Sequence, residues 1–282
     1  FVFLLSVFLS YTLLIATRLK AGIVPDETTH FIFSRHFSTS LGIPPNTSET
    51  LSRGFHVQYA PFLYYWINGR VINLLHFFWP SLSHWKTLVS LRIVNVFYAS
   101  GTIIFLYLFA KEFIKNKWWQ LLPIFLLTNT IMFVFLSGGI NYDNLANLFC
   151  MGGLLFLARI FNHKDFLVNS LLWMIFIAAG SLTKFTVLPL ALVMFAADIY
   201  YLVRYKKAIF PVNIKEKRIY LLASLLTLLL VGNFAIYGNN LLAYHSLTPP
   251  CVEAECRFSP NSIILEQKGL AKKLTISEAK SL

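Results

Sequence analysis

Long apolar runs, separated by short polar segments, dominate the chain. A helix needs about 20 apolar residues to cross the hydrocarbon core of a membrane. Seven runs are long enough to be candidates: 1–18, 89–110, 119–137, 144–161, 166–181, 185–203 and 218–242. No small-residue cleavage site follows the first run, so we interpret it as a membrane helix and not as a signal peptide. The pattern therefore predicts an all-α fold, a polytopic bundle of about seven transmembrane helices.

Three short connections between these runs are rich in Lys and Arg. The first holds Lys111, Lys115 and Lys117, the second Arg159 and Lys164, and the third six such residues from Arg204 to Arg218. Lys and Arg concentrate in cytoplasmic loops of membrane proteins, so these connections are expected on the cytoplasmic side. The connection at 138–143 carries no Lys or Arg, and the connection at 180–185 carries one lysine. Both are expected to face outward.

A further run, residues 61–79, is long enough to cross but contains several polar side chains. These are Asn68, Arg70, Asn73 and His76. Run 1–18 is expected to end on the outer side, and run 89–110 to start there. One more crossing between them would give run 89–110 the opposite orientation in the membrane. We therefore predict an amphipathic helix on the outer surface. Its interfacial anchors would be Tyr64, Tyr65, Trp66 and Trp79. Residues 19–88 then form an external loop with two surface helices.

The same pattern divides the chain into a transmembrane domain, residues 1–245, and an external polar segment, residues 246–282. Cys251 and Cys256 lie five residues apart in that segment, a spacing that permits a disulfide in an oxidising compartment. The sequence starts inside an apolar run at Phe1, and no recognisable motif closes its other end. We expect some residues to precede it and further membrane helices to follow.

The composition excludes two broad classes of protein. With 57% hydrophobic residues, 13% charged residues and a mean hydropathy of +0.64, the chain is too apolar for a soluble domain, in which about a quarter of the residues are charged. The formal charge of +12 could indicate nucleic-acid binding. However, the Lys and Arg residues lie between apolar runs and form no basic face, so the predicted partners are membrane lipids and not nucleic acid.

Two adjacent carboxylates, Asp26 and Glu27, follow the first apolar run. Pro25 precedes them, and Pro at the first helical position marks a helix start, so a helix should begin with both acids in its first turn. Asp26 and His30 are four residues apart and share a helical face. An ionised carboxylate at the mouth of a membrane cavity can act as a general base for an acceptor hydroxyl. The alternative is that the two acids cap the helix.

A second acidic site lies in GGINYDNLANLF, where Asp143 follows two glycines and is flanked by Asn141 and Asn144. Polar groups at the edge of a membrane span are costly to bury and indicate a functional cavity, although Asp143 could also cap the next helix. Both acidic stretches are expected on the outer side and could share one cavity. One acid would then take a proton while Asp143 positions a substrate or a divalent cation.

A lone lysine, Lys184, stands between two apolar runs on the expected outer side. It could bind a phosphate as a point charge, or extend its ammonium group to the membrane interface. Weaker candidates for the anion-binding role, which could equally be interfacial anchors, are Arg35, Arg70 and Arg92. The sequence contains none of the P-loop, zinc-protease or serine-hydrolase motifs.

Four segments occur in a recognisable order. They are PDE, which ends at Glu27, APFLYYW at 60–66, LRIVNVF and LFAKEF within 91–113, and GGINYDNLANLF followed by GSLTKFTVLPL. In this order the chain resembles the GT-C superfamily of membrane glycosyltransferases, which includes protein O-mannosyltransferases and the aminoarabinose transferases of lipid A. It is most similar to a poorly characterised bacterial group whose first loop reads PDE-x-x-HF. The resemblance covers about residues 1–205.

The resemblance implies a sugar transfer from a polyprenyl-phosphate carrier, often with inversion, to a lipid, glycan or protein acceptor. It also implies a multi-pass protein of the bacterial plasma (inner) membrane whose site faces outward. Asp26 would be the catalytic base, with Glu27 beside it, and Lys184 would hold the carrier phosphate. The substrate-binding residues would be Asp143, Lys184, His30, Asn141 and Tyr59.

One departure from the family pattern affects the acceptor. Gln58 and Tyr59 stand where the lipid A transferases have a Glu before their aromatic run. The acceptor, and a divalent cation with Asp143 as a ligand, are therefore open. Two other functions are also open: a transporter or flippase of lipid-linked saccharide, in which the same carboxylates bind cargo or protons, and a catalytically silent scaffold.

Overall fold

The computed structural model describes residues 1–53, 56–205 and 217–249, and within these ranges it contains helices and no strands. Five segments of this part are long and apolar enough to cross a membrane. Three are single helices: α5 (His84–Phe113), α8 (Tyr142–Phe161) and α9 (Phe166–Thr183). The other two are Phe185–Arg204, which contains α10 (Leu188–Arg204), and Lys217–Tyr244, which begins with α12 (Lys217–Asn233). The predicted class, an all-helical membrane protein, is thus confirmed.

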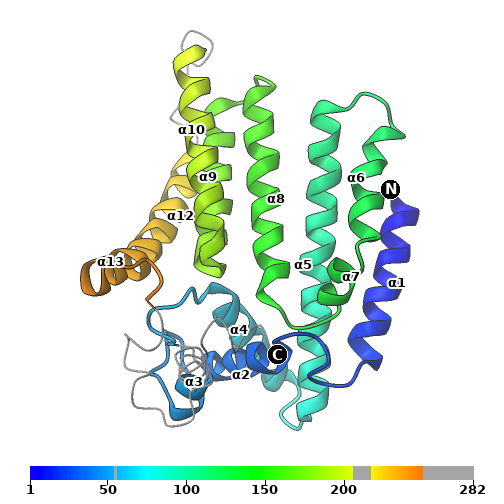
Figure 1. The fold of residues 1–282 in the computed structure, drawn as a ribbon, viewed down its shortest axis with the longest axis vertical. Coiled ribbons are helices and arrows are strands. Elements are labelled where there is room, and N and C mark those ends of the chain that lie inside the picture. The colour runs from blue at the N-terminus through cyan, green and yellow to red at the C-terminus, as the bar shows by residue number, and fades with distance from the viewer. Residues whose placement is uncertain (54–55, 206–216, 250–282) are drawn as a thin grey trace, which may run out of the picture.

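Helix α8 lies at the centre of the bundle (Figure 1). It packs against α9 on one side and α5 on the other, and α12 packs against α9. The approach of α8 to α9 depends on Gly152, since a Cβ atom there would lie 2.2 Å from the ring of Phe176. Small residues let membrane helices pack this closely. Helix α1 (Val2–Arg18) covers another face of α5, where Phe8 joins a buried cluster with Ala99 and Ile103.

The run at 119–137, a candidate membrane span, is not one continuous helix. The segment contains a 3₁₀ turn, η1 (Trp119–Leu121), and two short helices, α6 (Leu122–Thr128) and α7 (Ile131–Ser137), with a bend of 68°. At the break, the side-chain amide of Asn129 donates to the carbonyl of Phe125 at 2.7 Å, and the hydroxyl of Thr130 donates to that of Leu126 at 3.0 Å. The Thr130 hydroxyl thus bonds the Leu126 carbonyl, which a continuous helix would bond through its backbone, whereas the Asn129 side chain is a second donor to the Phe125 carbonyl.

The number of membrane crossings therefore differs from the simple count of apolar runs. If the bent pair is one span, the described ranges contain up to six candidates, and α1, with 17 residues, is a shorter apolar helix. The last run, 218–242, is also irregular. After α12 it continues through a π-helical turn, η3 (Phe234–Gly238), into α13 (Asn239–Tyr244). Seven crossings remain a prediction.

Two of the basic connections meet at one end of the bundle, together with the start of α12. Glu112, near the end of α5, accepts from Lys164 at 2.6 Å and from Arg159 at 3.3 Å, and Asp165 pairs with Arg218 at 3.1 Å. This end lies at the top of Figure 1, where α5 and α8 finish and α9 begins. The connections with few basic residues, before α8 and after α9, lie at the opposite end.

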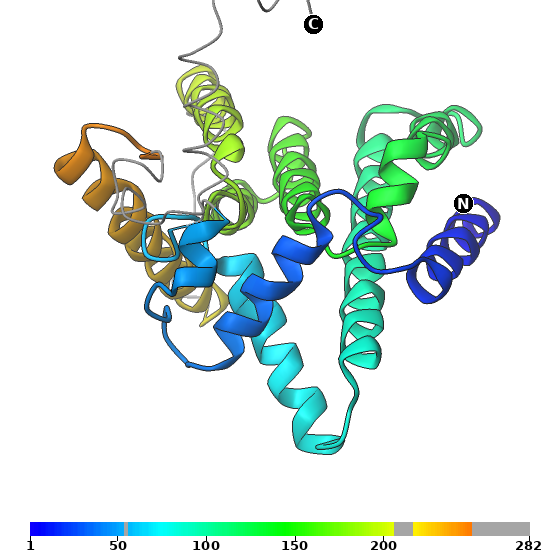
Figure 2. The same cartoon turned by 60° about the horizontal axis from the view of Figure 1, so that its bottom comes forward.

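A layer of three helices covers that opposite end. The helices are α2 (Glu27–Ser38), α3 (Ser48–Ser52) and α4 (Leu63–Phe78), and Figure 2 shows α2 and α4 lying across the ends of the bundle helices. Two surface helices were expected in this loop, and α3 is an additional short one. The backbones of α2 and α4 lie in close contact at Gly69 of α4 and Phe37 of α2. A Cβ atom on Gly69 would lie only 2.8 Å from the carbonyl carbon of Phe37, so this contact requires glycine.

The prediction that the aromatic residues of 61–79 are interfacial anchors is only partly confirmed. Trp79 is 58% exposed and can act as an interfacial anchor, but Tyr64 and Tyr65 are buried. The hydroxyl of Tyr64 donates to Asn95 of α5 at 2.9 Å, and that of Tyr65 is bonded to His30 of α2. Trp66 is half-buried and donates to a loop carbonyl. The two tyrosines therefore join α4 to its neighbours, and do not hold it at the lipid surface.

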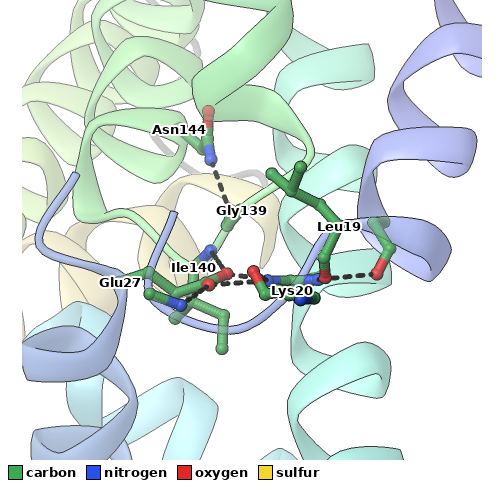
Figure 3. A network of polar contacts seen from close by, with 9 residues as sticks. Leu19, Lys20, Glu27, Gly139, Ile140 and Asn144 are labelled. Carbon is green, nitrogen blue, oxygen red and sulfur yellow. Dashed lines mark hydrogen bonds and ion pairs between the residues drawn. The ribbon is translucent and has the colours of Figure 1, made fainter. Parts of the chain in front are cut away.

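A buried ion pair joins the loop layer to the bundle. Glu27 accepts from Arg92 of α5 through both carboxylate oxygens, each at 2.6 Å, and neither side chain is exposed. The backbone N–H groups of Gly22 and Ile140 donate to the same carboxylate at 3.1 and 3.3 Å. Arg92 also donates to the carbonyls of Leu19 and Lys20, in the segment that follows α1. Figure 3 shows Glu27 beside Ile140 at one end of this network and Leu19 at the other. Glu27 and Arg92 thus hold four segments together.

Replacing Glu27 by Gln should destabilise the fold strongly, because it leaves the Arg92 guanidinium buried without a counter-charge. We expect a loss of about 3–5 kcal/mol of unfolding free energy, measured by chemical denaturation of the protein in detergent. The matched control is Asp165→Asn, which breaks the half-exposed pair with Arg218 and should cost no more than about 1 kcal/mol. Equal effects of the two changes would contradict this role of Glu27.

Candidate active site

A cavity of about 320 Å³ lies where the α2–α4 layer meets the adjoining ends of α8 and α9. Its charged and hydrogen-bonding lining includes Asp26, His30, Arg53, Tyr59, Tyr65 and Lys184. Four of these residues were predicted from the sequence as members of the site: Asp26, His30, Tyr59 and Lys184. The structure therefore brings together residues from the first loop and from the end of α9.

Asp26 stands immediately before α2, at the helix N-cap position. Its backbone is left-handed, with φ of 58°, a conformation that Asp tolerates better than most residues but that is uncommon outside Gly. Its backbone carbonyl accepts from the N–H of His30 at 2.9 Å, while its side chain makes no capping bond. Within the described ranges the carboxylate has no hydrogen bond or ion pair. It is exposed to the cavity and open to a ligand.

Glu27 does not line this cavity. Its carboxylate is fully used by Arg92 and by the N–H groups of Gly22 and Ile140. The adjacent acids therefore differ in their surroundings, and only Asp26 can reach a substrate in the cavity. Arg92, a weak candidate for anion binding or an interfacial anchor from the sequence, is instead the buried partner of Glu27.

His30 and two tyrosines form one wall. The Nδ1 atom of His30 lies 2.9 Å from the hydroxyl of Tyr65, and its ring meets the ring of Tyr142 edge-on at 4.5 Å. Burial, with a smaller effect from the charge of Lys184, lowers the pKa of His30 to about 3. Burial also raises the pKa of Tyr65 well above its ordinary value, and the charges of Asp26 and Asp143 contribute to this shift. At neutral pH both groups are uncharged hydrogen-bonding partners.

Lys184 forms an ion pair with Asp143 across the cavity edge. Its ammonium group also lies 4.6 Å from the centre of the Tyr142 ring, a cation–π contact. The side chains of Lys184 and Asp143 are 24% and 32% exposed, so a ligand can still reach them. Asp143 is not the cap of α8, because Asn141 takes that role by accepting from the Asp143 N–H at 2.8 Å.

A buried asparagine fixes the start of α8 behind this pair. The side-chain oxygen of Asn95 accepts from Tyr64, from the backbone N–H of Asn141 at 3.3 Å and from the amide of Asn144 at 3.2 Å. Asn95 lies inside an apolar run and is fully buried. A polar residue in a membrane span usually has such a function, and this signal could have identified it from the sequence.

The far wall connects the first loop to the last described helix. The rings of His56 and Tyr59 stack at 4.0 Å, and Tyr59 meets Tyr244 at 5.0 Å. Asn240 of α13 donates to the backbone carbonyl of Tyr59 at 2.9 Å. Arg53 completes this side of the cavity and was missed in the sequence, because it lies in a polar loop without periodicity.

A metal site finds no support in the described ranges. They contain no group of three or more His, Cys, Asp or Glu side chains placed to hold an ion. Asp143, the residue left open as a metal ligand, is bonded to Lys184. Cys251 and Cys256, whose spacing permits a disulfide, lie outside the described residues.

Comparison with known proteins gives no match, whether to a family model, to a curated protein or to a solved structure. The chemistry of the cavity is therefore the main indication of function. That chemistry consists of an exposed carboxylate, two cations and uncharged hydrogen-bonding groups from His30 and Tyr65.

The low pKa of His30 predicts a pH dependence of stability. In the unfolded chain a histidine takes up a proton near pH 6.5, whereas folded His30 stays neutral down to about pH 3. Folding is therefore opposed increasingly as the pH falls from about 6.5 towards 3. His30→Asn, which retains a group able to bond Tyr65, should reduce the loss of melting temperature between pH 7 and pH 5. His36→Asn, on the same helix but outside the cavity, is the control; an identical pH profile for His30→Asn and wild type would refute the assignment.

Proposed function

We propose that this protein is a GT-C-type membrane glycosyltransferase that moves a sugar from a polyprenyl-phosphate carrier to an acceptor hydroxyl or amine. The observation that carries the proposal is the carboxylate of Asp26, which lacks a partner among the described residues and lines the same cavity as Lys184. The order of sequence segments shared with that superfamily supports the same reaction class.

The cavity offers the two groups that such a transfer needs. Asp26 would accept the proton of the acceptor hydroxyl as the oxygen attacks the anomeric carbon. The bond between that carbon and the phosphate oxygen breaks, and its electron pair leaves with the carrier phosphate. Lys184 would stabilise the negative charge that develops on this leaving group. Because Lys184 is paired with Asp143, the phosphate would have to share or displace that carboxylate.

The position of the cavity suits a lipid-linked donor on the outer side. The cavity lies at the end of the bundle opposite to the basic connections, which the distribution of Lys and Arg assigns to the cytoplasm. Phe185, which follows Lys184 and lines the cavity, is 47% exposed. A carrier could therefore bring its phosphate to Lys184 while its chain remains beside α10. The volume of about 320 Å³ lies within the range of ordinary small-molecule sites.

A transporter or flippase is the second candidate, favoured by a carboxylate within the membrane helices. Asp198 of α10 is buried and lies 3.4 Å from the hydroxyl of Ser170 of α9. An ionisable residue inside a membrane span often marks a path for protons or substrates. Asp198 does not line the cavity that contains Asp26, so the two functions can be tested through different residues.

Asp26→Asn should reduce sugar transfer by about 10²–10⁴-fold, because it removes the general base and keeps the shape of the side chain. The measurement is transfer of a labelled sugar from native lipid-linked donor by purified protein in lipid vesicles. Asp165→Asn, at the other end of the bundle, is the control. Undiminished transfer in Asp26→Asn would rule out the proposed role. Movement of the donor across the vesicle membrane without transfer, sensitive to Asp198→Asn, would instead favour the flippase.

Lys184→Gln should lower kcat/KM for the lipid-linked donor by about tenfold to a hundredfold, because the leaving phosphate loses a charged partner. The change should leave KM for the acceptor unaltered. Lys164→Gln, whose ammonium pairs with Glu112 away from the cavity, is the matched control. A defect confined to the acceptor KM would contradict the assignment of Lys184 to the donor phosphate.

A further inference from the structure

The guanidinium group of Arg53 lines the cavity with very few partners. The only hydrogen bond it makes to a described residue runs from Nη1 to the hydroxyl of Thr29, at the long distance of 3.5 Å. Its Nε atom is buried and has no hydrogen-bond partner, and no described carboxylate pairs with it. A buried N–H of a charged group without an acceptor is costly, so this arrangement calls for a functional reason.

Other cations near this end of the described chain are better satisfied. Arg92 bonds both oxygens of Glu27 and several carbonyls, and Lys184 pairs with Asp143. Arg70 also has a buried Nε atom without a partner, but its Nη2 donates to two carbonyls and the residue lies outside the cavity. Arg53 is thus the cation of the cavity wall whose charge is left for a ligand.

Asp26 does not neutralise Arg53, although both residues line the cavity. No ion pair joins them in the described structure, and the Asp26 carboxylate remains open. The cavity therefore presents a carboxylate and a separate guanidinium group at the same time. An arginine fork binds planar or tetrahedral oxoacids through two parallel N–H bonds, which Lys184 cannot do.

We propose that Arg53 binds a second anionic oxoacid group, a phosphate or a carboxylate, in addition to the phosphate assigned to Lys184. As a statement about substrates it rests on the proposed transfer reaction. The group has two sources of the same chemistry: an anionic acceptor, or the second phosphate of a diphosphate-linked donor. In both cases the donor and acceptor together carry at least one more negative charge than a monophosphate-linked donor with a neutral acceptor.

The first test measures binding alone, with orthophosphate and pyrophosphate as probes and calorimetry on the full chain in detergent. Arg53→Gln should weaken binding of at least one probe by about tenfold or more, and Arg53→Lys should retain part of the affinity. Arg35→Gln, an exposed cation of α2 outside the cavity, is the control and should bind as wild type does. Unchanged binding of both probes in Arg53→Gln, with a normal melting temperature, would overturn the inference.

Comparison with Lys184→Gln separates the two sources. If one diphosphate spans both cations, the two changes weaken pyrophosphate binding non-additively and affect orthophosphate less. If the second anion belongs to the acceptor, the effects are additive, and Arg53→Gln raises the KM of the acceptor while that of the donor stays constant. A structural role as counter-ion of Asp26 predicts instead a lower melting temperature with unaltered probe binding, which would refute the proposal.

The binding test is independent of catalysis. If Asp26→Asn retains full transfer, Asp26 is not the general base. Anion binding by Arg53 is still tested by the calorimetric measurements, which do not depend on transfer. Asp26→Asn should in addition tighten binding of the probes several-fold, because it removes a negative charge from the cavity that holds Arg53. Weaker binding in Asp26→Asn would contradict an anion subsite at Arg53.

Discussion

The arrangement of the whole cavity depends on one buried ion pair, Glu27 with Arg92. Two opposite charges without solvent exposure are tolerated only when their remaining hydrogen-bonding positions are filled, and here backbone groups fill them. Those backbone groups come from the loop after α1 and from the turn before α8. The pair therefore fixes the start of α2 against α5, and with it the direction in which the preceding residue faces.

Two neighbouring carboxylates consequently have different surroundings. Glu27 is enclosed and saturated with donors, whereas Asp26 is exposed to the cavity beside His30 and Tyr65. The left-handed backbone at Asp26 lets consecutive side chains point in different directions. Such a division between a structural acid and an accessible acid is how proteins assign separate roles to similar groups.

The long spans were predictable because an apolar run of about 20 residues has few alternatives to a membrane helix. The break near Asn129 was not, since it lies inside an apolar segment, and the side-chain bonds of Asn129 and Thr130 to nearby carbonyls are seen only in the structure. The burial of Tyr64 and Tyr65 was also missed, because an interfacial helix and a helix packed beneath a loop have similar aromatic patterns. Pairing of Glu27 with Arg92, 65 residues away, and the presence of Arg53 in the cavity depend on tertiary structure alone.

The bond between Asn240 and Tyr59 has a consequence for how the protein is made. These residues are 181 positions apart, so the far wall of the cavity closes only after α12 and α13 have been synthesised and inserted. Until then the first loop is exposed along one flank, and Asp26 stands in an incomplete enclosure. During biosynthesis the Asp26 carboxylate therefore emerges before the pocket around it is complete.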